Sequence, residues 1–221
     1  MWNIKKIISR IKHWHRAQTI YSIHSPFVFK YLKFVFDKNR VYYAFIALKK
    51  NTAKQASTSH TIGNKKQKTV SRHSCERIFR HLVYTHAQSF AAYGVPDTHL
   101  LSYVKYTGLQ KGLIICPQAQ HHNRSNMGME EWRNFKQYSS IQNLRKQPHK
   151  INIDCLCIMP GAQLDETQWR ELLHLSHAQA VYIVLHPTQW NPDRLEKLER
   201  NFSLIIRTNS MQLMWREYTG Q

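Results

Sequence analysis

Short apolar runs alternate with segments of helical periodicity through most of the chain, and this alternation limits the fold more than any other feature. The apolar runs cover residues 90–93, 113–116, 153–158 and 181–185. Runs of this length between helical segments are typical of buried parallel strands. The sequence therefore predicts an α/β protein with a doubly wound sheet and helices on both of its faces.

The segments between these runs complete the expected order of elements. Helices are expected over residues 77–86, 97–106, 129–138, 166–177 and 192–200, and a short strand over 139–142. Two further apolar runs, 202–207 and 211–216, are separated by Thr208-Asn209-Ser210. A turn of polar residues between two such runs indicates a C-terminal antiparallel hairpin.

The N-terminal 48 residues are expected to form a basic helical extension. In residues 2–19, isoleucines recur at helical spacing, and the basic residues between them are Lys5, Lys6, Arg10, Lys12 and Arg16. Such a helix can lie on an anionic membrane or along a phosphate backbone, or it can pack on the protein body with its lysines in water. Ser25 and Pro26 are suited to start a second helix, and a third opens near Tyr42.

Residues 49–74 are polar and basic and carry almost no large apolar side chains. A segment of this composition cannot bury a core, so a loop or linker is expected, followed by the sheet domain over 75–221. Its basic residues Lys65, Lys66, Lys68 and Arg72 join those of the first helix as candidates for binding a polyanion.

The charge of the chain is uneven. The whole chain has 32 Lys and Arg against 13 Asp and Glu, a net charge of +19. Residues 1–150 hold 26 basic and 5 acidic residues, whereas residues 151–221 hold 6 and 8. Such asymmetry indicates nucleic acid, an anionic membrane surface or an acidic protein as partner, although basic charge can also serve solubility alone.

The cysteines and histidines give no catalytic or metal-binding pattern. Cys75, Cys116, Cys155 and Cys157 do not form a disulfide framework in a chain of this length, and no ligand pairs stand at zinc-site spacing. No spacing singles out a Cys–His nucleophile among the 14 histidines. Without an apolar leader or membrane span, a cytoplasmic location is expected.

Two short motifs carry a family resemblance. The stretch HSPFVF at residues 24–29 is followed by YYAF at 42–45. Together they resemble the opening of a bacterial subfamily of class I S-adenosylmethionine (SAM)-dependent methyltransferase-like proteins, and the order of elements extends the resemblance over nearly the whole chain. It implies a Rossmann-like sheet with an antiparallel C-terminal hairpin, preceded by a basic helical extension.

The resemblance also implies a cofactor site at the strand ends, where this chain departs from the family pattern. Gly94 matches the family's first glycine, but Ala92 stands for the upstream acid and Thr98 for a later glycine. Cys116 stands where a carboxylate would bind the ribose, Met159 replaces an aspartate, and Leu185-His186 replaces an acidic pair. Asp154 is retained, at the end of its strand that faces away from the site.

These departures favour a pseudoenzyme that acts as a binding or scaffold module, with no cofactor expected and no metal. Two alternatives stay open: an active SAM-dependent methyltransferase with a reshaped pocket, and a basic protein whose main activity is binding nucleic acid or a membrane surface.

Overall fold

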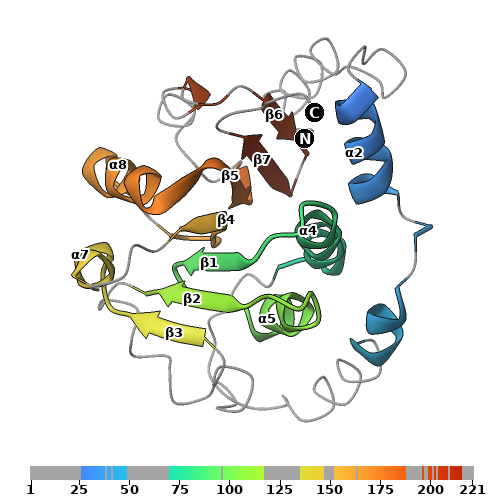
Figure 1. Cartoon of the computed structure of the whole chain (residues 1–221), viewed down its shortest axis with the longest axis horizontal. Coiled ribbons are helices and arrows are strands. Elements are labelled where there is room, and N and C mark those ends of the chain that lie inside the picture. The colour runs from blue at the N-terminus through green and yellow to red at the C-terminus, as the bar shows by residue number, and fades with distance from the viewer. Residues whose placement is uncertain are drawn as a thin grey trace, which may run out of the picture. The chain divides into compact units, whose positions relative to one another are not determined.

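The computed structural model describes residues 26–37, 39–40, 42–48, 70–95, 97–116, 135–146, 152–162, 164–187, 196, 199–200, 202, 204–208 and 210–215. The chain divides into two compact units, Met1–Arg40 with Gly220–Gln221 and Val41–Thr219. The described part of the first unit is one helix and the turn that follows it. The second unit contains the sheet (Figure 1).

Helix α2, Pro26–Phe36, is the described element of the first unit. Its first residue is proline, as predicted, because a proline there gives up no intrahelical hydrogen bond. Val28, Tyr31 and Val35 are buried, whereas Lys30 and Lys33 are exposed. The helix is therefore amphipathic, with a basic outer face.

The second unit begins with a helix over residues 43–48 and continues with alternating helices and strands. Its further helices are α4 (Arg72–Tyr84), α5 (Thr98–Lys105), α7 (Ile141–Arg145) and α8 (Glu166–Leu175). Its strands are β1 (Ser89–Tyr93), β2 (Lys111–Ile115), β3 (Phe135–Tyr138), β4 (Ile153–Ile158), β5 (Ser176–Leu185), β6 (Leu204–Arg207) and β7 (Met211–Trp215).

The strands form one sheet in the order β3-β2-β1-β4-β5-β7-β6. Strands β1 to β5 run parallel, and β7 pairs antiparallel with both β5 and β6. Helices α4 and α5 cover one face of the sheet, and α7 and α8 the other (Figure 1). The predicted doubly wound sheet with a C-terminal antiparallel hairpin is confirmed.

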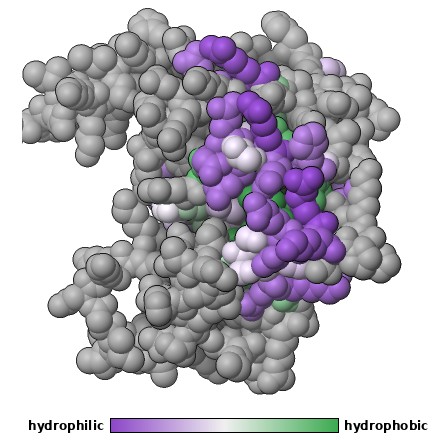
Figure 2. All heavy atoms as spheres, turned by 90° about the vertical axis from the view of Figure 1, so that its left-hand side faces the viewer, coloured by the Kyte–Doolittle hydropathy of each residue, from purple (hydrophilic) through white to green (hydrophobic). Residues whose placement is uncertain are grey.

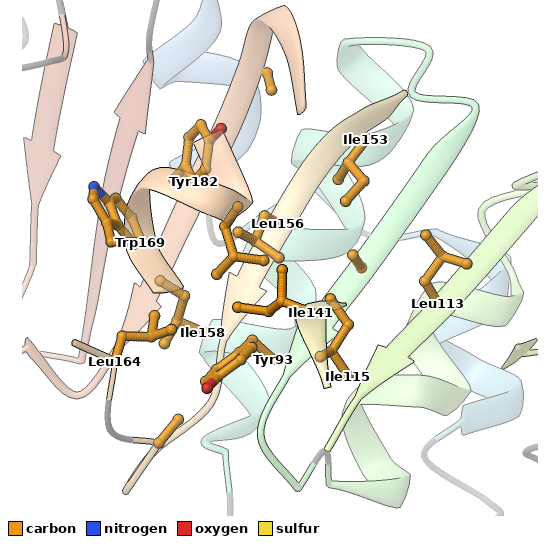
Figure 3. Packing of buried hydrophobic residues seen from close by; sticks show 14 of the residues in the cluster. Tyr93, Leu113, Ile115, Ile141, Ile153, Leu156, Ile158, Leu164, Trp169 and Tyr182 are labelled. Atoms are coloured by element: carbon orange, nitrogen blue, oxygen red, sulfur yellow. The ribbon is translucent and has the colours of Figure 1, made fainter. Parts of the chain in front are cut away.

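The core under α7 and α8 is built from the strand residues that point to that face. Leu156 and Ile158 of β4 lie beside Tyr93 and Ile115, and Ile141 and Trp169 cover them from the helices (Figure 3). Each large apolar side chain buried in this way contributes about 1.5–3 kcal/mol to the free energy of folding.

On the other face of the sheet, Phe45 packs edge-on against Phe79 of α4, with ring centroids 5.1 Å apart. This contact holds helix 43–48 against the sheet domain.

The amino ends of β1 and β4 are joined by one carboxylate. Oδ2 of Asp154 accepts hydrogen bonds from the backbone amides of Gln88 and Ser89, both at 2.9 Å, and from the Ser89 hydroxyl at 3.0 Å. Asp154 thus aligns β1 with β4 at the amino ends of these strands, opposite their carboxyl ends. This agrees with the prediction from its place at the start of the strand.

Two element predictions between β2 and β4 are wrong. Residues 135–138, expected to end a helix, form strand β3, and residues 139–142, expected to form a strand, contain the start of helix α7. The hydroxyl of Ser140 accepts the amide of Asn143 at 3.1 Å and so caps α7. β3 is an edge strand of four residues, and this is too short for an alternation of apolar and polar side chains to show in the sequence.

Two boundaries also differ from the prediction. Helix α4 begins at Arg72, not at Arg77, because the hydroxyl of Ser71 accepts the amide of Ser74 at 3.2 Å and caps the helix within polar sequence. Strand β5 begins at Ser176, within the segment expected to end helix α8, and Ser176 pairs with Ile153 across a bulge. Among the residues described, no helix is long and apolar enough to cross a bilayer.

Candidate site at the carboxyl ends of the strands

The strand order reverses between β1 and β4, and this places a candidate site at their carboxyl ends. β2 and β3 follow β1 on one side, while β4 and β5 lie on its other side. In open α/β sheets, ligands bind in the crevice where the order reverses. The residues that follow β1, β2, β4 and β5 therefore decide what this edge can hold.

The loop after β1 turns at Gly94, whose φ of +101° is a conformation that side-chain-bearing residues rarely adopt. Its amide donates to the carbonyl of Ile115 at 2.8 Å. A β-carbon at this position would lie 3.0 Å from Cβ of Ala162 and 3.1 Å from Cβ of Met159. The space that the glycine leaves is thus occupied by the loop after β4.

That loop is a tight turn over the end of β4. The amide of Met159 donates to the carbonyl of Tyr93 at 2.9 Å, and the amide of Ala162 donates to the carbonyl of Met159 at 3.1 Å. Gly161 supplies the positive φ, +77°, that closes the turn. Met159 is 1% exposed, so its side chain is part of the packed interior and does not reach into solvent.

The ends of β2 and β5 present a thiol and an imidazole. Cys116 is buried, and its amide donates to the carbonyl of Tyr138 at 2.9 Å. His186 is half-buried with a φ of +51°, and its amide donates to the carbonyl of Ser210 at 2.9 Å. Among the six positions expected from the resemblance, Gly94 and Met159 lie in contact with each other.

The two remaining positions of the expected site are Ala92 and Thr98. Ala92 is fully buried within β1, opposite Ile114 on one side and Cys157 on the other, so it packs in the sheet. Thr98 is the first residue of α5.

Asp97 is a carboxylate in the loop after β1 that the sequence analysis did not single out. Oδ1 accepts the amide of His99 at 2.8 Å and caps α5, while Oδ2 accepts the amide of Val70 at 2.9 Å. One side chain therefore holds the start of α5 and the residue before the α4 cap together.

Asp165 is a second carboxylate that was not predicted, and it lies near the Tyr93 hydroxyl. Burial raises the pKa of Tyr93 to about 12, and the neighbouring Asp165 and Cys116 add to the effect. Oδ1 of Asp165 accepts the amide of Gln168 at 2.7 Å, and the Gln168 side chain accepts the amide of Asp165 at 3.1 Å. This capping box is visible in the sequence as Asp165-x-x-Gln168 before apolar residues, and it explains why α8 begins at Glu166, where the helix was predicted to start.

The outer surface beside this edge is polar. On the side of the molecule that includes α7 and α8, hydrophilic side chains dominate the described surface, and hydrophobic ones show only in gaps between them (Figure 2). Ion pairs there join Arg145 to Glu171 and Arg170 to Glu166. This face offers no large apolar patch for a ligand among its described side chains.

Three thiols on the α4 side of the sheet are shielded from solvent. Cys75, Cys155 and Cys157 are fully buried, and burial raises the pKa of each thiol above its ordinary value. Within the described residues, no three His, Cys, Asp or Glu side chains converge in a way that could hold a metal ion.

The basic residues predicted to bind a polyanion fall mostly outside the described residues, namely Lys5, Lys6, Arg10, Lys12, Arg16, Lys65, Lys66 and Lys68. The remaining one, Arg72, lies in the first turn of α4. Its Nε donates to Oε1 of Glu76 at 2.8 Å, so its charge is partly compensated within the domain.

Solved methyltransferases share this fold. A methyltransferase from Geobacter sulfurreducens is 12% identical with a TM-score of 0.54, over 86% of this chain and 97% of its own. The O-methyltransferase TomG from Streptomyces achromogenes, solved with SAM, is 11% identical with a TM-score of 0.55, over 85% and 95%. An O-methyltransferase from Bacillus cereus, solved with SAH, is 11% identical with a TM-score of 0.52, over 90% and 100%.

No family model matches the chain, and no curated protein matches it in sequence. At these identities the structural similarity establishes the fold alone. The chain has a class I methyltransferase fold, and a fold alone does not define an activity.

Proposed function

We propose that this chain is a methyltransferase-fold protein whose cofactor site has degenerated and that acts as a binding module through its basic N-terminal half. The observation that carries the proposal is the packing of Met159 and Ala162 against Gly94. In the fold family, glycine in this loop leaves room for the cofactor to approach the backbone. In this chain, the β-carbons of Ala162 and Met159 occupy that room, because they would lie within 3.1 Å of a β-carbon placed on Gly94.

The end of β2 supports the same conclusion. The resemblance implies a carboxylate there that accepts both ribose hydroxyls of SAM. Cys116 is buried and offers a thiol, a weak acceptor that cannot replace two charged hydrogen bonds. Loss of a well-matched polar partner weakens recognition by about 10⁴-fold in sites that depend on it. The described residues at the strand tips therefore do not fit this cofactor.

The two carboxylates described at this edge already serve the fold. Both oxygens of Asp97 accept backbone amides, and one oxygen of Asp165 caps α8. If Asp97 bound a ribose instead, the two backbone amides that donate to it would lose their acceptor. This loss would cost about 1–3 kcal/mol for each amide that is buried.

The charge distribution supports a binding role. The first 40 residues hold nine basic residues and one acidic residue. A surface of this sign attracts polyanions, and the partners that it fits are nucleic acid, an anionic membrane or an acidic protein.

Isothermal titration of the full chain with SAM and with SAH tests the loss of the cofactor site. We expect no heat of binding, and no cofactor in mass spectra of the purified chain. The Bacillus cereus O-methyltransferase, crystallised with SAH, is the positive control under the same conditions. Micromolar binding, co-purified cofactor or transfer of a labelled methyl group to any acceptor would contradict the proposal.

A further inference from the structure

The helix over residues 43–48 belongs to the same compact unit as the sheet and packs on the sheet domain through one of its sides. The ring centre of Phe45 lies 5.1 Å from that of Phe79 in α4 and 5.6 Å from that of Tyr103 in α5. Phe45 and Leu48 are 4% and 2% exposed. These contacts fix which side of the short helix faces the domain, and hence which side faces away from it.

The outer side of this helix is apolar. Tyr43 and Ile46 stand three residues apart, so they share one side of the helix, and they are 93% and 51% exposed. Tyr106, directly after α5, is 49% exposed and follows Tyr103 by one helical turn. Among the described residues, no other large apolar side chain is as exposed, and α7 and α8 carry none of the three. Exposed apolar side chains that gather on one side of a domain mark a contact surface.

The charge of the helices on this side of the sheet is positive. Helix 43–48 has no charged residue, whereas α4 and α5 together carry four cations and one carboxylate, a net charge of +3. On the opposite face, α7 and α8 carry two cations and two carboxylates, which sum to zero. The carboxylate of α4 is Glu76, which is 7% exposed, so neither α4 nor α5 presents an acidic group at its surface. The four cations are Arg72, Arg77, Arg80 and Lys105.

Apolar side chains beside a positive charge fit an anionic membrane better than they fit other partners. A membrane interface accepts aliphatic and tyrosine side chains below the headgroups, and its anionic lipids attract the cations next to them. A single-stranded nucleic acid can stack its bases on the tyrosines, but it makes no comparable contact with an isoleucine such as Ile46. A second copy of this chain would bring two positively charged faces together, and like charges across an interface oppose binding.

We propose that Tyr43, Ile46 and Tyr106 form a docking surface for an anionic lipid bilayer, with Ile46 inserted into its interface. This assignment rests on the proposed function, because it names the partner of the binding module and a surface of the basic N-terminal half that meets it. The sequence analysis placed membrane binding in residues 2–19 and did not include these three residues. The structure adds them because the packing of Phe45 shows which side of the short helix faces outward.

The test places an environment-sensitive nitrobenzoxadiazole label at position 46 of the full-length chain through Ile46→Cys. The four native cysteines are buried, so labelling is directed to the new thiol, and peptide mapping verifies this. On vesicles of phosphatidylserine and phosphatidylcholine we expect the fluorescence to rise at least about twofold and to shift to shorter wavelength, because the label leaves water. Vesicles of phosphatidylcholine alone should produce a much smaller change, since they lack the attracting charge.

The matched control carries the same label at position 167 through Thr167→Cys, an exposed site of α8 across the sheet. We expect its fluorescence to change little on the same vesicles. Without any label, Y43S/I46S should weaken vesicle binding at least about tenfold, whereas Ile46→Trp should strengthen it, because tryptophan favours the membrane interface. Circular dichroism verifies that each variant keeps its helix content.

Four outcomes would overturn the assignment. Equal responses at positions 46 and 167, or vesicle binding with no response at position 46, would mean that another part of the chain contacts the lipid. No binding to the anionic vesicles would contradict the proposed partner itself. A response at position 46 to single-stranded RNA alone, or to a rising concentration of the chain without vesicles, would assign the surface to nucleic acid or to a second copy.

A titration with SAH on the same preparations separates this surface from the proposed function. Cofactor binding would overturn the degenerate site whatever the vesicle result. Vesicle binding without a response at position 46 would remove this docking surface and leave the binding module in place.

Discussion

Gly94 and Met159 pack so closely that a β-carbon on Gly94 would lie 3.1 Å from that of Met159. The contact joins the loops after β1 and β4 at the point where the strand order reverses. The space that Gly94 leaves is filled by the neighbouring side chains of Met159 and Ala162. The contribution of this packing to the free energy of unfolding can be measured.

Gly94→Ala is expected to destabilise the chain through two separate effects. The left-handed conformation, φ +101°, costs alanine about 1–2 kcal/mol, and the clash with Ala162 and Met159 adds about 1–3 kcal/mol. Gly108→Ala is the control, since its φ is +77° and nothing lies within 4 Å of the added carbon. Urea unfolding measures both variants, and equal losses would mean that Gly94 is not tightly packed.

Asp97→Ala is expected to cost more stability than Asp165→Ala. Both residues cap a helix, a role worth about 0.5–2 kcal/mol, but Asp97 also accepts the amide of Val70. Its loss should speed hydrogen exchange at the Val70 amide by local opening, whereas the Asp165 variant should leave that amide protected. Similar exchange at Val70 in the two variants would show that Asp97 acts only as a cap.

The sequence predicts elements well where burial produces a clear pattern. Strand β4, Ile153–Ile158, is predicted to the residue because all its residues but Asp154 are apolar and because it lies inside the sheet, between β1 and β5. Strand β3 is missed because it is short and lies at the edge of the sheet, so only Phe135 is buried and the alternation is hidden. Helix α4 begins at Arg72 in polar sequence, where the one available signal was the cap Ser71.

The site was predicted less completely than the fold. Gly94 and Met159 could be placed at strand ends from the sequence, but their contact could not, because it depends on how the turn at Gly161 folds back. Asp97 and Asp165 were overlooked because they follow their strands at a distance, as helix caps. Both aspartates stand directly before a helical segment, which is the sequence pattern of a helix cap.

The described thiols are expected to be unreactive in the native chain. Cys75, Cys116, Cys155 and Cys157 are all buried, and burial raises the pKa of Cys75, Cys155 and Cys157. Since the thiolate is the reactive form, an aromatic disulfide reagent should modify none of them within minutes and all four in urea. Rapid modification of any of them in buffer, located by peptide mapping, would show that its strand or helix opens readily.

His81 should make the stability of the chain depend on pH below neutrality. The side chain lies within α4, 1% exposed and edge-on to Trp215 at 5.9 Å, and burial lowers its pKa from 6.5 to about 3. The unfolded chain takes up a proton on this residue near pH 6.5, whereas the folded chain does not. Its stabilising effect is therefore complete above pH 6.5 and is lost as the pH falls toward 3.

The expected loss from His81 is about 1.4 kcal/mol for each pH unit below 6.5. Urea unfolding between about pH 6.5 and 5 measures the effect where ordinary carboxyl groups remain mostly ionised, and comparison with a variant separates His81 from the other histidines. A His81→Gln variant should lose stability at pH 7 but show a shallower dependence on pH than the native chain. His174→Gln, which removes an exposed imidazole, is the control. If His81→Gln keeps the native slope, the neutral buried imidazole is not what couples folding to pH.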